Sequence, residues 1–214
     1  MNRNLTITRD GHEFSRCGDG NVVHESVVVD GDVRIGSRNY IGPGTTLIGP
    51  LEIGDDCYVI GASIGAPPEH DEWYAGDRRS TAGVWIGNRC IIREFVTINA
   101  GLGRTTILGD GCFVMNKGHV AHDCILGDGV YTAGGVMIGG HVTIGDHAYI
   151  GMTSCIHPRL TIGKVVMIGM NSTVTRDLDD HVLAYGSPAK AHGLNEEGLR
   201  RLAPAPMVLG SPLP

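Results

Sequence analysis

The amino-acid sequence predicts an all-β fold, a left-handed parallel β-helix followed by one short C-terminal helix. Aliphatic residues recur every six positions over most of the chain, and glycine often follows directly, as in Ile35-Gly36 and Ile144-Gly145. An inward aliphatic residue, a sharp turn and a small inward residue make one hexad, and three hexads close a triangular coil of about 18 residues. Composition agrees, because 33 glycines and only 5% aromatic residues disfavour a helical bundle.

The aliphatic hexad positions define the extent of this hexapeptide-repeat prism. They are Val23, Val29, Ile35, Ile41, Leu47, Ile53, Val59, Ile86, Ile92, Ile98, Leu108, Val114, Val120, Leu126, Ile138, Ile144, Ile150, Ile156, Ile162, Ile168 and Val174. Thr132 alone breaks the second half of the series. The series halts after Val59 and after Ile98, which predicts loop insertions at about residues 66–83 and 99–107.

The chain beyond the repeat is expected to form a short helix and a tail. We assign residues 1–190 to the β-helix and residues 191–214 to the C-terminal segment. In "GLNEEGLRRL", Asn195 is a predicted N-cap, with acidic residues in the first turn and arginines near the end, as the helix dipole favours. The final "APAPMVLGSPLP" is too rich in proline to continue the helix.

Charge and hydropathy exclude several classes of function. A net charge of −6 gives no general electrostatic reason to bind nucleic acid or an anionic membrane. The N-terminal segment lacks the apolar run of a signal peptide, and no segment has the ~20 apolar residues of a membrane span. We therefore expect a cytoplasmic protein without nucleic-acid contacts or membrane insertion.

The cysteines and histidines do not indicate a metal or redox site. Cys57, Cys90, Cys112 and Cys124 occupy the fourth place after an aliphatic residue, where the prism interior requires a small apolar group. There is no CxxC pair. A zinc-binding branch of this fold, which resembles the gamma-class carbonic anhydrases, carries a His-x4-His pair, but no two of the ten histidines here are five residues apart. We expect no bound metal.

The segment "GHVAHDCILG" points to acid/base chemistry. His122 takes the second place after Val120, which we expect to be an exposed corner position. An imidazole, with an ordinary pKa near 6.5, suits removal of a proton from a hydroxyl. Residues 18 apart stack in neighbouring coils, so Gly140 is expected above His122, with its N–H available to an oxyanion. A solvated turn histidine is the alternative.

Asp123, His141 and Arg159 make up the neighbouring predicted column, at intervals of 18 residues. Charges of alternating character, one coil apart, can orient the site and contact a phosphate or carboxylate. A surface ladder that only stabilises the corner is the alternative.

Five segments resemble successive blocks of the bacterial UDP-N-acetylglucosamine O-acyltransferases, hexapeptide-repeat enzymes that begin lipid A synthesis. The segments are "IREFVTIN", "GHVAHDCILGDG", "GGHVTIGDHAYIG", "IHPRLTIG" and "YGSPAKAHGLNEEGLRRL", and together they span about residues 91–201. The resemblance implies that His122 is the general base, Asp123 its helper and Gly140 the oxyanion N–H donor. It also implies the substrate contacts, which are His119, His141, His157, Asp71 for the acceptor sugar, and Asn195, Glu197 and Arg201 for the UDP part. Helix capping is the alternative role of Asn195 and Arg201.

The resemblance further implies the donor, the acceptor and the assembly. The donor is an acyl carrier protein that holds the acyl group as a 4'-phosphopantetheine thioester, or acyl-CoA, and no cofactor stays bound. The acceptor is a nucleotide sugar. Met152 and Met170 stack on another corner, and Met170 matches the acyl-length ruler of the family, so a short or medium chain, possibly a 3-hydroxyacyl chain, is expected. Outward columns on different corners also predict a homotrimer with clefts shared between chains.

Three residues differ from the family pattern and leave alternatives open. Asn99 replaces a histidine, Trp73 a basic residue and Pro158 a glutamine. One alternative is an acetyl- or acyl-CoA-dependent transferase that acts on an oxygen or nitrogen of another sugar or small molecule. The other is a non-catalytic binding or scaffold protein.

Overall fold

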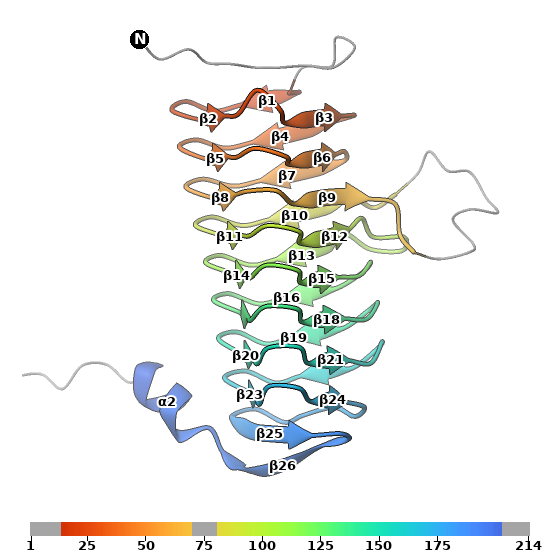
Figure 1. The fold of residues 1–214 in the computed structure, drawn as a ribbon, viewed down its shortest axis with the longest axis vertical. Coiled ribbons are helices and arrows are strands. Elements are labelled where there is room, and N and C mark those ends of the chain that lie inside the picture. Colours follow the sequence, from red (N-terminus) through yellow and green to blue (C-terminus); the bar gives the residue numbers. More distant parts are fainter. Residues whose placement is uncertain (1–13, 70–80, 203–214) are drawn as a thin grey trace, which may run out of the picture.

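The computed structural model describes residues 14–69 and 81–202, and in them the chain winds into a triangular prism of stacked coils (Figure 1). Eight coils each contribute one strand to each of three sheets, here called A, B and C. All strand pairs between coils are parallel, which confirms the predicted left-handed parallel β-helix.

The strands are short and follow one another around the three sheets. Sheet A contains β1 (Arg16–Cys17), β4 (Val33–Ile35), β7 (Leu51–Ile53), β10 (Val84–Ile86), β13 (Thr106–Leu108), β16 (Ile125–Leu126), β19 (Thr143–Ile144) and β22 (Thr161–Ile162). Sheet B contains β2 (Val22–Val23), β5 (Tyr40–Ile41), β8 (Tyr58–Val59), β11 (Ile91–Ile92), β14 (Phe113–Val114), β17 (Tyr131–Thr132), β20 (Tyr149–Ile150), β23 (Met167–Ile168), β25 (Val182–Gly186) and β26 (Ala189–Leu194). Sheet C contains β3 (Val28–Asp30), β6 (Thr46–Ile48), β9 (Ser63–Ala66), β12 (Thr97–Asn99), β15 (His119–Val120), β18 (Met137–Ile138), β21 (Cys155–Ile156) and β24 (Thr173–Val174).

Backbone pairing between coils fixes which residues stack. Ile35 pairs with Ile53, and Ile138 pairs with Ile156, so residues 18 apart occupy equivalent places. Across the first insertion, Ile53 pairs with Ile86. The ladder therefore continues across the first insertion.

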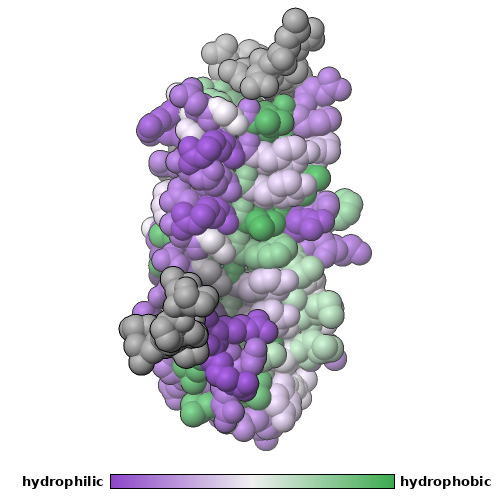
Figure 2. All heavy atoms as spheres, turned by 90° about the vertical axis from the view of Figure 1, so that its left-hand side faces the viewer, coloured by the Kyte–Doolittle hydropathy of each residue, from purple (hydrophilic) through white to green (hydrophobic). Residues whose placement is uncertain are grey.

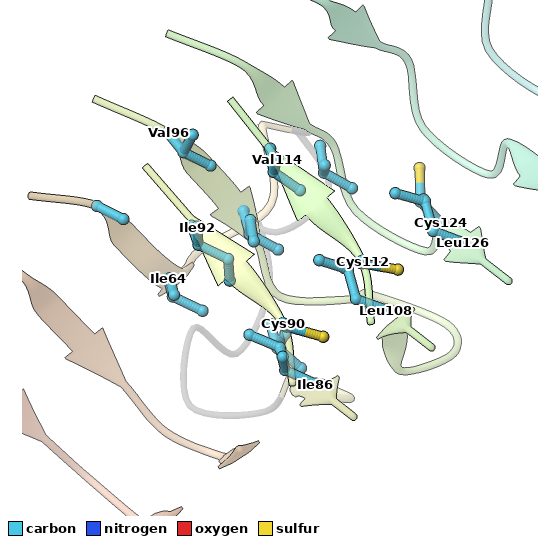
Figure 3. Packing of buried hydrophobic residues seen from close by; sticks show 14 of the residues in the cluster. Ile64, Ile86, Cys90, Ile92, Val96, Leu108, Cys112, Val114, Cys124 and Leu126 are labelled. Carbon is cyan, nitrogen blue, oxygen red and sulfur yellow. The ribbon is translucent and has the colours of Figure 1, made fainter. Parts of the chain in front are cut away.

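The hexad side chains fill the prism interior. Every predicted aliphatic position from Val29 to Val174 is at most 3% exposed. The hexad after Val59 is one residue short, so Ile64 is also buried, an inward position that a strict count of six misses. Figure 3 shows these side chains pointing into the prism from neighbouring coils.

The four predicted interior cysteines are buried as expected. Cys90, Cys112 and Cys124 donate their thiol hydrogens to backbone carbonyls of the next coil, at 3.1, 3.2 and 3.2 Å. Burial raises the pKa of the Cys124 thiol to about 11. These cysteines pack as small apolar groups.

Both insertions leave the prism at the same corner, where the chain passes from sheet C to sheet A. We call this the CA corner, and name the AB and BC corners in the same way. One insertion lies between β9 and β10 and the other between β12 and β13, close to the predicted ranges. Asp123, His141 and Arg159 stack at this corner, each with a left-handed backbone, at φ of 61°, 62° and 67°.

The C-terminal end of the prism is closed by a hairpin and a helix. β25 continues sheet B in parallel, and β26 then turns back antiparallel to it. Asn195 caps α2 (Glu196–Leu202) as predicted, because its Oδ1 accepts the Gly198 N–H at 3.0 Å while its Nδ2 donates to the Val165 carbonyl. Neither α2 nor any other helix within 14–69 and 81–202 is long and apolar enough to cross a membrane.

Thr132 gives a direct test of the interior. It is 1% exposed, and its Oγ1 has no hydrogen-bond partner among the described residues. We predict that Thr132→Val raises the free energy of unfolding by about 1 kcal/mol, because the buried hydroxyl is unsatisfied. The measurement is urea denaturation followed by circular dichroism.

Thr45→Val is the matched control for this prediction. Thr45 is also fully buried, but its Oγ1 donates to the Gly42 carbonyl and accepts the Gly61 N–H. This substitution should lower the stability. Equal effects of the two substitutions would contradict the assignment.

Candidate active site

The candidate site lies at the CA corner, beside the two insertions. His122 and Asp123 stand between β15 and β16, one coil after the insertion of residues 100–105 and two coils after that of residues 67–83. In Figure 1 the segment between β12 and β13 projects from this side of the prism. The fold therefore brings this irregular segment next to the histidine-aspartate pair.

His122 is only 8% exposed, so the prediction of an exposed corner histidine is wrong. Two residues of the next coil cover its ring. The His141 ring stands edge-on at a centroid distance of 5.1 Å, and a Cβ added to Gly140 would lie 2.8 Å from His122 Nε2. A hexad pattern gives the direction of a corner side chain but not the coverage by its neighbours.

Gly140 is needed where it lies. Any larger residue would push its Cβ against the imidazole of His122, since the ring atoms Nε2 and Cε1 would be 2.8 and 2.9 Å away. The Gly140 carbonyl accepts the Arg159 N–H at 2.9 Å, whereas the Gly140 N–H has no acceptor among the described residues. Gly140 therefore lies beside the imidazole, as the predicted stacking of residues 18 apart requires.

Asp123 is fully buried and carries the densest set of hydrogen bonds at the corner. Its Oδ2 accepts His122 Nδ1 at 2.6 Å and the Leu102 N–H at 3.0 Å. Its Oδ1 accepts the N–H groups of Gly103 at 2.8 Å and Arg104 at 2.6 Å. The carboxylate is thus held by three consecutive backbone amides of the insertion and by the catalytic candidate itself.

These contacts keep Asp123 ionised. Burial alone would raise the pKa of its carboxyl, but the Leu102 amide, the His122 ring and the Arg104 and Gly103 amides together lower the pKa to about 2. An ionised Asp123 can only accept a hydrogen bond in this contact, so His122 Nδ1 carries the hydrogen and the lone pair of the imidazole lies on Nε2. The pair has the geometry of a base oriented by a carboxylate.

The predicted column of Asp123, His141 and Arg159 is present, but the burial of Asp123 rules out the solvent-facing role expected for its charge. The stacking is as predicted, since the His141 N–H donates to the His122 carbonyl. The Asp123 carboxylate, however, faces the insertion and not the solvent, so it neither contacts an external phosphate nor forms a surface ladder. His141 is half-buried, and its pKa is lowered mainly by burial, against the opposite effect of Asp123.

Two further predicted histidines lie on the same side of the prism. His119 on β15 contacts Thr97 Oγ1 through Nδ1 at 2.7 Å, and its Nε2 lies 3.7 Å from Glu69 at the start of the first insertion. Burial lowers the pKa of His119, while Glu69 opposes this shift. His157 is exposed, one coil above Gly139. The corner thus gathers several imidazoles around His122.

The ligand atoms of His122, Asp123 and His141 lie within 4.8 Å of one another, a spacing that a metal ion requires. Both Asp123 oxygens already accept two hydrogen bonds each, and His122 Nδ1 is one of the donors. Only one imidazole of the group, His141, lies outside this network. The donor set therefore fits a histidine-carboxylate pair better than a metal site.

Five other predicted site residues lie at the remaining two corners. Met152 and Met170 stack at the BC corner and are 49% and 68% exposed. Asn195, Glu197 and Arg201 lie at the AB corner, beside a pocket of about 540 Å³ between α2 and the outer face of sheet B. Figure 2 faces the side on which α2 packs and shows hydrophilic side chains at α2 and along the neighbouring turns.

Three hydrogen bonds within the chain occupy these AB-corner side chains. Asn195 is 6% exposed and uses both side-chain atoms inside the chain, and Arg201 Nε pairs with Glu197 Oε1 at 3.0 Å. The capping alternative for Asn195 is therefore confirmed. Tyr131 and Tyr149, stacked at 5.0 Å, form the opposite wall of the pocket.

Of the three residues that differ from the family pattern, the structure describes Asn99 and Pro158. Asn99 is 3% exposed, and its Nδ2 has no partner among the described residues. Pro158 stacks on Gly139. Asp71 and Trp73 lie outside the described residues.

Sequence reasoning missed the segment that holds Asp123. Leu102, Gly103 and Arg104 belong to an insertion, and Thr106 Oγ1 accepts the Asp123 N–H at 2.9 Å. The position of this insertion, one coil before the histidine-aspartate pair, was the available signal. Its conformation follows no repeat.

Comparison with known proteins finds relatives of the chain in one enzyme class. No protein-family model matches the chain. Over 190 residues it is 42% identical to the acyl-(acyl-carrier-protein)–UDP-N-acetylglucosamine O-acyltransferase of Thermodesulfovibrio yellowstonii, covering 84% of the chain and 72% of that protein. The protein of the same name from Campylobacter lari is 36% identical over 199 residues, covering 89% and 75%. The match to Xanthomonas campestris relatives is shorter, 37% identical over 125 residues, and spans 48% of the chain and 46% of their length.

Solved structures agree with these matches. A UDP-N-acetylglucosamine acyltransferase from Campylobacter jejuni superposes with a TM-score of 0.82 at 32% identity, over 92% of the chain and 75% of that protein. The corresponding Bacteroides fragilis structure gives 0.86 at 29% identity, over 96% and 79%.

The buried carboxylate predicts a specific pH dependence of stability. The pKa of Asp123 is about 2 in the folded protein and ordinarily 3.8, so its stabilising effect is complete above about pH 4 and is lost as the pH falls towards 2. We predict that Asp123→Asn removes about 2 kcal/mol of this pH-dependent stability. Urea denaturation at several pH values between 2 and 6 measures it.

Asp19→Asn, at an exposed carboxylate of the first coil, is the control. It should leave the slope of stability against pH in this range close to that of the wild type. Parallel curves for the wild type and Asp123→Asn would contradict the assigned ionisation.

Proposed function

Because the chain belongs to the family of acyl-(acyl-carrier-protein)–UDP-N-acetylglucosamine O-acyltransferases, we propose that it transfers an acyl group from a carrier thioester to a sugar hydroxyl. The acceptor is a UDP-N-acetylglucosamine-like nucleotide sugar. The observation that carries this proposal is the His122-Asp123 pair with the Gly140 N–H beside it.

His122 acts as the general base. Its Nε2 takes the proton of the acceptor hydroxyl, whose oxygen attacks the thioester carbonyl carbon. The Gly140 N–H donates to the resulting oxyanion. The carbon–sulfur bond then breaks, the thiolate leaves and takes the proton from the imidazolium, and the ester is released. Asp123 stabilises the imidazolium while it exists.

No cofactor is needed, because the donor brings its own activated bond. The 4'-phosphopantetheine thioester supplies the leaving group, and both substrates are held together in one cleft. His119, His141 and His157 line this cleft. Asp71 contacts the acceptor sugar. The proposed substrates place the reaction in the cytoplasm.

The proposed substrate contacts are spread over all three corners of one prism. The base lies at the CA corner, Met152 and Met170 at the BC corner, and Glu197 and Arg201 at the AB corner. One chain cannot bring these groups around a single substrate, whereas three prisms side by side can. We therefore propose a homotrimer in which the base of one chain faces the acyl and nucleotide groups of its neighbour.

The acyl side is shortened in this arrangement. Met152 and Met170 expose large apolar side chains at consecutive coils, above Gly134 in the same column. Such side chains end an apolar track and favour short or medium acyl chains. Asn195 contributes by anchoring α2 and not by a direct ligand contact, because both of its side-chain atoms are engaged.

The transfer assay is the first test of function. Acyl groups of graded length, carried by acyl carrier protein or by coenzyme A, are offered with UDP-N-acetylglucosamine to the wild type and to His122→Ala. We expect product with short or medium chains from acyl carrier protein, and a loss of at least ~100-fold in the variant.

His24→Ala, an exposed histidine of the first coils, should keep full activity. Faster transfer from coenzyme A would favour the alternative donor. Equal rates for the wild type and His122→Ala would refute the proposed base.

Mixed assemblies test the shared cleft. Arg201→Ala and His122→Ala chains are each expected to be inactive alone. Refolded together in equal amounts, they should recover about one quarter of the wild-type activity, since that fraction of interfaces pairs an intact base with an intact Arg201. No recovery from well-folded mixed trimers would mean that each site lies within one chain.

A further inference from the structure

The buried charge of Asp123 needs a fixed source of hydrogen bonds. An ionised carboxylate removed from water is strongly destabilised unless its oxygens accept hydrogen bonds. Three consecutive N–H groups, of Leu102, Gly103 and Arg104, form a concave anion-binding turn around it. These amides belong to an insertion, so the hexad ladder does not fix their position.

Hydrogen bonds connect this insertion to the preceding coils. The Ala82 N–H donates to the Gly101 carbonyl, and the Gly101 N–H donates back to Gly83. Thr105 Oγ1 also donates to the Ala82 carbonyl at 2.8 Å. A Cβ on Gly101 would lie 1.6 Å from the Arg104 carbonyl oxygen, so glycine lets the loop close on itself.

Towards the following coils, one side chain of the insertion holds it in place. Arg104 Nε donates to the Asp123 carbonyl at 2.7 Å, and its Nη2 reaches the His141 carbonyl at 3.5 Å. The guanidinium thus links the insertion to the coil of Asp123 and to the coil above it. Charge-assisted bonds of this kind are stronger than bonds between neutral groups.

We propose that Arg104 is a positioning residue, which holds the amides of residues 102–104 in hydrogen-bonding position around Asp123. Through Asp123 it sets the tautomer and orientation of His122. Its catalytic consequence rests on the proposed function, whereas its structural consequence does not. While the Arg104 hydrogen bonds are in place, Asp123 stays anionic and keeps the hydrogen on His122 Nδ1. Without them, the amides move away, the buried carboxylate loses its donors, and the imidazole loses a fixed orientation.

The test compares Arg104→Met, which keeps an unbranched apolar stem, with Arg104→Lys, which restores a cation. Arg89→Met is the matched control, because Arg89 is an exposed arginine at the AB corner that pairs with Asp110. The full-length protein is labelled with ¹⁵N-histidine, and the His122 ring signals are assigned by comparison with His122→Ala. Long-range ¹H–¹⁵N spectra then report the tautomer, and transfer kinetics report kcat and KM.

We expect a single Nδ1–H tautomer in the wild type and in Arg89→Met, a mixture in Arg104→Met, and at least partial rescue in Arg104→Lys. The kcat of Arg104→Met should fall about 10- to 100-fold with KM within about twofold, as for other residues that orient a catalytic group. An unchanged tautomer and kcat in folded Arg104→Met, or a change confined to KM, would overturn the proposal.

The two proposals fail in distinguishable ways. A tautomer change in Arg104→Met supports the positioning role even if no acyl transfer is found with any substrate. In that case the proposed function falls, and Arg104 still orients the histidine. If acyl transfer occurs but the His122 tautomer is unchanged in Arg104→Met, the positioning role of Arg104 is refuted and the proposed function is retained.

Discussion

Backbone hydrogen bonding between successive coils is the constraint on which the rest of the structure depends. Each strand pairs with the strand one coil earlier. The number of coils between two residues in the sequence therefore sets their distance along the prism axis, at about 4.8 Å per coil. An inward aliphatic residue at every sixth position makes this ladder stable, because each coil buries its hexad side chains against the next. The corners accept insertions without breaking this ladder, and the proposed base and oxyanion donor lie at the corner that carries both insertions.

At the CA corner, the electrostatics depend on what the insertions contribute. A histidine and an aspartate at a bare turn would both face water, and the pair would be weakly oriented. The 100–105 insertion instead surrounds Asp123 with amides, while Gly140 and His141 press on the other side of the imidazole. The pair is thereby fixed before any substrate arrives, which is the preorganisation that proton transfer and oxyanion stabilisation require.

The regular part of this structure was predictable from sequence and the irregular part was not. The repeat gave the coils, the interior cysteines, both insertions and the stacking of Gly140 over His122. It missed Ile64, because one hexad is a residue short, and it placed His122 in solvent, because periodicity gives the direction of a side chain and not what covers it. The roles of Arg104 and its neighbouring amides could not be predicted, because a loop outside the repeat has no periodic pattern that would place its residues.

The hairpin of β25 and β26 has a consequence for the molecule as a whole. A stack of parallel coils ends in unpaired backbone groups that a second copy could extend without limit, as in fibrous assemblies. Here sheet B finishes with a strand that runs in the opposite direction. An incoming coil would find the wrong polarity there. At this end of sheet B, the hairpin therefore opposes end-to-end extension by a further parallel coil.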